Sequence, residues 1–134
     1  MRKRNVLHVM CVVLTLALAG AASAAHHEVK VSEKGGVGKF LTDAKGMTLY
    51  IFKKDSPGKS ACAGPCVEKW PLYSQEKVAA PDGVMAGDFG TITREDGKKQ
   101  TTYKGMPLYY FAGDKKAGDV TGQGMGKVWY VANP

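Results

Sequence analysis

The sequence predicts a small all-β domain built from two pseudo-symmetric antiparallel units, arranged as a sandwich or a barrel. The first observation is an internal repeat: residues 45–55 (KGMTLYIFKKD) recur as residues 104–114 (KGMPLYYFAGD), an offset of 59 that also carries Trp70 onto Trp129. The second is that 17 glycines and 6 prolines separate short apolar segments, and no segment after the N-terminus keeps a helical period. A duplication of this kind predicts two copies of one supersecondary unit sharing a core.

The N-terminus has the features of a secretory signal peptide over residues 1–24. Residues 2–4 are basic, residues 6–19 are apolar but too short to span a membrane, and residues 22–24 read Ala-Ser-Ala, a cleavage motif. Leu18-Ala19-Gly20 is followed by alanine and not by the cysteine that a lipid anchor needs. We therefore expect a soluble periplasmic or secreted protein, without a lipid anchor and without a membrane span after cleavage.

Removal of the signal peptide changes the charge balance. The 19 basic residues become 16, against 12 acidic ones, so the formal net charge falls from +7 to +4. The remaining lysines are scattered and form no basic stripe, which argues against nucleic acid as a partner. About 110 residues are enough for a single domain with one modest core, and we expect a monomer.

The expected organisation follows from the repeat. Residues 25–38 form an N-terminal tail or first strand, and residues 39–134 form the two-repeat β domain, with repeat 1 at about 39–73 and repeat 2 at about 98–132. Strands are predicted at 29–31, 40–42, 47–52, 89–94, 99–103, 106–111 and 128–131. Asp96-Gly97 predicts a hairpin with a two-residue type I′ turn. One short helix is expected at Cys66–Trp70, ended by Pro71.

Alternation along the repeat strand predicts its burial. Met47, Leu49 and Ile51 share one face, whereas Tyr50 and Phe52 share the other. The second copy repeats this arrangement, with Tyr109 and Phe111 on a common face. Because both faces are apolar, we expect both strands to be covered on both sides and the four aromatic residues to share a core.

The same residues carry a resemblance to a known family. The chain resembles a bacterial family of secreted repeats and predicted lipoproteins with a Y-x-[FWY]-x-x-D motif. The motif residues are Tyr50, Phe52, Asp55, Tyr109, Phe111 and Asp114. The resemblance extends from about residue 39 to residue 131, and includes L-T-D-A-x-G-M-T-L-Y, C-x-x-x-C before W-P, and a glycine-rich run ending in V-W-Y. It implies an exported protein and supplies no catalytic residues.

Two cysteines, Cys62 and Cys66, remain after the signal peptide is removed. Gly64-Pro65 between them favours a turn, and an oxidising compartment favours a structural disulfide. A thiolate pair that binds copper(I) is the alternative. A thiol–disulfide redox site is a third interpretation, although the C-x-x-C spacing of such sites is absent.

Catalytic side chains are scarce in the expected domain. No histidine follows His27, so a Ser-His-Asp or Cys-His catalyst inside the domain is excluded. Asp55 and Asp114 could act as paired carboxylates, but each precedes turn residues, and we expect them to cap turns. The sequence thus predicts a protein that is not an enzyme.

The histidines suggest one metal site. Cleavage after Ala24 would leave Ala25-His26-His27, whose amine, two amides and third-position imidazole suit copper(II); a tail that binds nothing is the alternative. The sequence therefore predicts an exported, non-enzymatic binding or structural module, with no cofactor and an unknown ligand or envelope protein as partner. A copper-handling protein using His26, His27 or the cysteine pair is the alternative, and a thiol–disulfide redox protein is the third.

Overall fold

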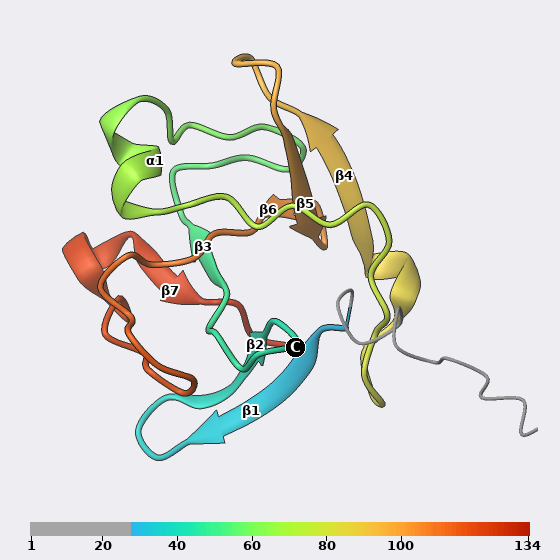
Figure 1. Ribbon diagram of the computed structural model, residues 1–134, viewed down its shortest axis with the longest axis vertical. Coiled ribbons are helices and arrows are strands. Elements are labelled where there is room, and N and C mark those ends of the chain that lie inside the picture. The colour runs from blue at the N-terminus through green and yellow to red at the C-terminus, as the bar shows by residue number, and fades with distance from the viewer. Residues whose placement is uncertain (1–27) are drawn as a thin grey trace, which may run out of the picture.

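The computed structural model describes residues 28–134, so the expected signal peptide and both His26 and His27 lie outside the described residues. Its strands are β1 (Lys30–Lys34), β2 (Gly38–Thr42), β3 (Tyr50–Phe52), β4 (Phe89–Thr93), β5 (Lys99–Tyr103), β6 (Met106–Pro107) and β7 (Trp129–Val131). Its helical turns are α1 (Pro65–Lys69), η2 (Ala86–Asp88) and η3 (Met125–Lys127). The predicted mainly-β fold with one short helix is confirmed (Figure 1).

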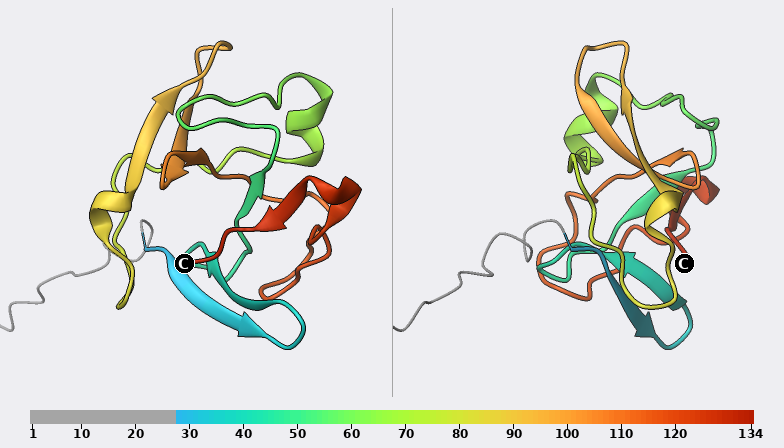
Figure 2. Two further views of the ribbon diagram at one scale, coloured as in Figure 1. Left: turned by 180° about the vertical axis from the view of Figure 1, so that it is seen from behind. Right: turned by 90° about the vertical axis from the view of Figure 1, so that its right-hand side faces the viewer.

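Residues 28–134 form three small antiparallel sheets: β1–β2, β3–β7 and β4–β5–β6. The β1–β2 and β4–β5 hairpins lie on opposite sides of the β3–β7 pair (Figure 2). The sequence therefore folds as several short ladders wrapped around a common core.

The two copies meet at Tyr50 and Tyr109. The amide of each tyrosine donates to the carbonyl oxygen of the other, over 2.8 Å and 3.0 Å. Tyr50 also pairs with Val131, and Tyr109 pairs with Leu72, which is the equivalent of Val131 at the repeat offset. A pseudo-twofold axis therefore passes between the two tyrosines, and it brings together strands that lie far apart in sequence.

Alternation along the repeat strands divides the apolar residues into two clusters. Tyr50, Phe52 and Tyr109 are buried in one cluster with both tryptophans, and Phe111 packs against it while partly exposed. Leu49 and Leu108 are fully buried in the other cluster. The repeat strands are thus covered on both faces, as the alternation predicts.

Four aromatic rings form a continuous stack inside the first cluster. The ring centroids lie 4.2 Å apart for Phe52–Trp129, 3.8 Å for Trp129–Trp70 and 4.4 Å for Trp70–Phe111. Successive rings come from alternate copies, so neither copy can build the stack alone. A Cβ at Gly122 would lie 2.7 Å from the Trp70 ring, which is why this position has no side chain.

The hairpin turn predicted at Asp96-Gly97 differs from the structure. The hairpin exists, with Thr93 opposite Lys99, but the amide of Arg94 donates to the carbonyl oxygen of Lys98, so the loop has three residues and the two-residue type I′ prediction is wrong. Asp96 keeps a negative φ because its carboxylate accepts hydrogen bonds from within the loop, and Gly97 alone takes the left-handed conformation (φ 82°).

The repeat strands are shorter than predicted. The segment expected at 47–52 contributes β3 over Tyr50–Phe52, and the segment expected at 106–111 contributes β6 over Met106–Pro107. Proline has no backbone N–H, which restricts the ladder in the second copy. The short helix begins one residue before the predicted Cys66, because Pro65 suits the first turn of a helix.

The aromatic stack should dominate the stability of the domain. Replacing Phe52 by alanine removes one end of the stack and should lower the free energy of unfolding by about 3–5 kcal/mol. Met85 provides the control, because it is 72% exposed, and Met85→Ala should change the stability by less than about 0.5 kcal/mol. Urea unfolding would measure both. Equal stability losses for the two variants would contradict the stack's structural role.

Candidate functional site

The tyrosine and aspartate of the repeated motif form hydrogen bonds across the two copies. The Tyr50 hydroxyl donates to Asp114 Oδ2 over 2.7 Å, and the Tyr109 hydroxyl donates to Asp55 Oδ2 over 2.6 Å. Each pair joins residues more than 50 positions apart. Sequence reasoning assigned the aspartates to their local turns and missed these reciprocal bonds.

The second oxygen of each aspartate organises its local loop. Asp55 Oδ1 accepts the amide of Ala61 over 2.6 Å, and Asp114 Oδ1 accepts both the amide and the hydroxyl of Thr121. These bonds are the loop-capping role expected from sequence. Each carboxylate therefore both closes a loop of its own copy and anchors a tyrosine of the other copy.

Burial raises the pKa values of both tyrosines and of Asp55. Burial raises the pKa of the Tyr50 and Tyr109 phenols well above their usual value, and the hydrogen bonds to Asp114 and Asp55 raise it further. Burial also raises the pKa of the Asp55 carboxyl, while the bonds from Ala61 and Tyr109 and the nearby Arg94 oppose that rise. Both phenols are consequently held protonated, as hydrogen-bond donors.

Arg94 extends the network of the Tyr109–Asp55 pair and has no equivalent in the first copy. Both hairpin loops have three residues between their closing pairs, Lys34–Gly38 in the first hairpin and Arg94–Lys98 in the second. The second hairpin is longer by that one pair, which follows Thr93–Lys99. At the repeat offset the counterpart of Arg94 is Gly35. The two copies therefore differ at this point in both length and charge.

The Arg94 side chain is only 4% exposed, and polar groups surround it. Nε donates to Asp96 over 3.1 Å, Nη1 donates to Ser60 Oγ over 2.6 Å and to Gln100 Oε1 over 2.8 Å, and Nη2 donates to the carbonyl oxygen of Cys62. The Ser60 hydroxyl lies 2.6 Å from the Tyr109 hydroxyl. A continuous polar chain thus runs from buried Asp55 to Asp96 at the surface.

A groove opens above this network, between residues 54–63 and residues 92–96. It consists of two adjoining hollows of about 430 Å³ and about 90 Å³ that share Lys59, Ser60, Ala63 and Glu95. We call it the Ser60 groove. Its other lining residues are Lys54, Ser56, Gly58, Ala61, Ile92, Thr93, Arg94 and Asp96.

Sequence reasoning missed the Ser60 groove, although one feature could have indicated it. Arg94 is the only arginine after Arg4, in a chain whose other basic residues from position 5 onward are all lysines. Arginine is preferred where a cation must be buried and must satisfy several acceptors at fixed angles. Its position beside the predicted turn therefore indicated a buried polar network.

The predicted disulfide is present. Cys62 and Cys66 are bonded, with their Cα atoms 5.4 Å apart, and Cys62 packs within the aromatic cluster. The bond closes the loop that leads into α1. Since the two sulfurs are bonded to each other, they are not available as thiolates for copper(I) in this state.

Metal ligands do not gather within the described part of the chain. Residues 28–134 contain no group of three or more histidine, cysteine, aspartate or glutamate side chains that could hold a metal ion. The copper site expected at His26 and His27 falls outside those residues and stays a prediction. Among residues 28–134, no helix has the length and apolar character that crossing a membrane requires.

Comparison with known families agrees with the internal duplication. Residues 32–73 and residues 90–133 match a family described as a secreted repeat of unknown function. The chain belongs to this family of secreted repeats. Its two matched spans begin within β1 and β4, so each secreted repeat includes one hairpin, one repeat strand and one tryptophan. No curated protein and no solved structure matches the chain.

The reciprocal bonds can be measured by a double-mutant cycle. Tyr50→Phe and Asp114→Asn should each destabilise the protein by about 1.5–3 kcal/mol, because each removes the hydrogen bond between the Tyr50 phenol and the Asp114 carboxylate. Together they should show a coupling of about 0.5–3 kcal/mol in urea unfolding. Tyr50→Phe combined with Asp55→Asn is the matched control, since these residues share one motif without a bond between them. Equal coupling in both cycles would contradict the crossed pairing.

The raised pKa of Asp55 predicts a pH dependence of stability. The folded protein holds the proton of this carboxyl more tightly than the unfolded chain, whose carboxyl has the usual pKa of 3.8. The stabilising contribution of Asp55 to the free energy of unfolding is fully present at pH values below the pKa of the unfolded chain. It is lost as the pH rises through the pKa of this carboxyl in the folded protein. As the pH rises above 3.8, Asp55→Asn should therefore gain stability relative to the wild type in urea unfolding. The opposite trend would show that Arg94 and the hydrogen bonds outweigh burial.

Proposed function

We propose that the protein is an exported, non-enzymatic binding module whose Ser60 groove accepts a small ligand with an anionic group. The observation that carries this proposal is the location of the groove. It lies over the Arg94 network, where the second copy differs from the first. Features shared by both copies serve the common fold, so a feature of one copy is the better candidate for a specific role.

The shared motif supports a role in folding and not in catalysis. Both oxygens of Asp55 and both oxygens of Asp114 accept hydrogen bonds within the protein. Both tyrosine hydroxyls donate to those carboxylates. A general base needs a carboxylate within reach of a substrate proton, and these two are already bonded inside the core. The motif therefore stabilises the domain that presents the groove.

The lining of the groove favours an anionic ligand. Lys54 and Lys59 are exposed at its wall, and their ammonium groups can approach a carboxylate or phosphate. Ser56 and Ser60 add hydroxyl groups, whereas Ala61 and Ala63 leave space. Glu95 on the hairpin side disfavours ligands with dense negative charge. We accordingly expect a small molecule or peptide end with one or two negative charges.

Titration of isotope-labelled protein by NMR tests this proposal. Inorganic phosphate and a short peptide ending in glutamate serve as probes. We expect saturable amide shifts concentrated in residues 54–63 and 92–96. The double variant Lys54→Ala, Lys59→Ala should weaken binding about tenfold or more, which corresponds to about 1.4 kcal/mol.

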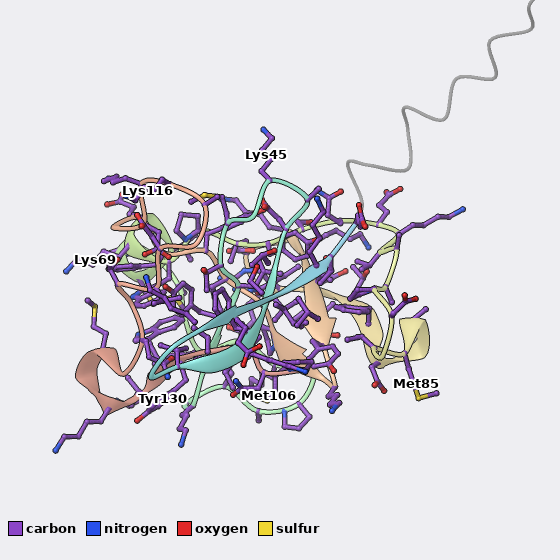
Figure 3. The ribbon with its side chains drawn as sticks, turned by 90° about the horizontal axis from the view of Figure 1, so that it is seen from below. Lys45, Lys69, Met85, Met106, Lys116 and Tyr130 are labelled. Atoms are coloured by element: carbon purple, nitrogen blue, oxygen red, sulfur yellow. A yellow bond between two sulfur atoms is a disulfide. The ribbon has the colours of Figure 1, made fainter. Side chains whose placement is uncertain are left out.

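The control variant removes the same charge elsewhere. Lys45 and Lys116 project from the surface (Figure 3), and neither lines the Ser60 groove. Lys45→Ala combined with Lys116→Ala should leave the affinity of both probes unchanged. An equal loss in the two double variants, or shifts spread over the whole surface, would show non-specific attraction to a cationic protein and would refute the proposed site.

A further inference from the structure

The core contains a group of aromatic side chains whose arrangement goes beyond apolar packing. The indole rings of Trp70 and Trp129 are stacked face to face, 3.8 Å apart and only 3° from parallel. The rings of Phe52 and Phe111 cover the two outer faces of this pair. Indole is among the side chains that lose one electron most readily, and a positive charge over an aromatic face is stabilised by its π electrons. The stack can therefore spread a positive charge over several rings.

Each tryptophan also contacts one tyrosine of the motif. The Tyr50 and Trp70 rings meet in a T-shaped arrangement at a centroid distance of 5.4 Å, and the Tyr109 and Trp129 rings do so at 5.1 Å. A phenol that loses an electron also releases its proton, since a buried positive charge without a partner is costly. Asp114 and Asp55 accept these two phenolic hydrogen bonds, so each tyrosine has a proton acceptor already in place.

The two tyrosine–aspartate bonds satisfy buried polar groups and connect the copies, and the same bonds place each phenolic proton beside a carboxylate oxygen. Each tyrosine also contacts a tryptophan of the stack. The structure therefore places an electron donor, a proton donor and a proton acceptor together, once in each half of the core.

We propose that the Trp70–Trp129 stack and the two tyrosine–aspartate pairs form a redox-active core that captures a single oxidising equivalent and holds it as a tyrosyl radical. This activity is independent of ligand binding in the Ser60 groove. The oxidant is a one-electron acceptor of the oxygen-radical class, which an exported protein in an oxidising compartment encounters.

The step is balanced in electrons, protons and charge. The oxidant removes one electron from the stacked indoles and is reduced, which leaves a radical cation on Trp70 and Trp129. One electron then passes from Tyr50 to the indole pair, while the phenolic proton moves to Asp114 Oδ2 along the existing hydrogen bond. The products are neutral indoles, a neutral tyrosyl radical and a protonated aspartic acid. Tyr109 and Asp55 can perform the same step in the other half.

Flash oxidation of the folded protein tests the proposal, with photogenerated ruthenium(III) tris(bipyridine) as the one-electron oxidant. We expect a tryptophan radical that decays as a tyrosyl radical appears, followed by transient absorption and by electron paramagnetic resonance. The transfer should be slower in D2O, because the phenolic proton moves in the same step. This isotope effect is measured on the wild-type protein and requires no variant.

Variants assign the signal to residues. Tyr50→Phe combined with Tyr109→Phe should abolish the tyrosyl radical and prolong the tryptophan radical. Asp55→Asn combined with Asp114→Asn keeps both phenols and should also prolong the tryptophan radical, in protein shown by circular dichroism to be folded. Tyr103→Phe combined with Tyr130→Phe is the control and should leave both signals unchanged, because the Tyr103 ring lies against Phe89 and the Tyr130 ring lies under the Lys53 ammonium. A tyrosyl radical lost only in the control variant, or an absent isotope effect in the wild type, would overturn the proposal.

Discussion

Two hydrogen bonds, from Tyr50 to Asp114 and from Tyr109 to Asp55, connect the halves of this domain through buried polar groups. Each aspartate closes a loop in its own copy and accepts a hydrogen bond from a tyrosine of the other copy. The buried tyrosine and aspartate of one copy are therefore fully hydrogen-bonded only when the second copy is in place. The stack formed by Phe52, Trp70, Phe111 and Trp129 imposes the same condition on the apolar side chains, since its rings alternate between copies. The short strands follow from this constraint: with only a few residues per ladder, the sheets depend on the shared core for their stability.

Because the two copies form a symmetric core, the positions at which they differ are informative. The second hairpin is longer than the first by one residue pair, and Arg94 is one of those two added residues. Its guanidinium bonds Ser60, Gln100 and the Cys62 carbonyl, and so connects the hairpin to the disulfide loop. The Ser60 groove lies directly above. The two copies thus combine a common interior with one face on which only the second copy contributes a buried cation.

The fold was more predictable from the sequence than the site. The repeat, the alternation of Leu49 with Tyr50, and the spacing of Cys62 and Cys66 are local patterns, and they predicted the two units, the two-sided burial and the disulfide. The bond between Tyr50 and Asp114 joins residues 64 positions apart, and local spacing carries no information about which aspartate a tyrosine will meet. The hairpin at Asp96 was predicted and its turn was not, because side-chain bonds from Asp96 decide between two turn geometries of similar length. The groove arises from the approach of two loops, which only the packed core brings together.

The contact between Tyr50 and Tyr109 has the geometry of a symmetric dimer interface within one chain. Two separate copies of the unit would make the same paired bonds twice, and their association would depend on protein concentration. Joining the copies in one polypeptide makes that association intramolecular, with a high effective concentration that does not fall when the protein is diluted. It also removes a restriction on dimers of identical chains, in which every substitution appears on both sides of the symmetry axis. A single arginine on one side only, such as Arg94, is possible because the two halves are encoded separately.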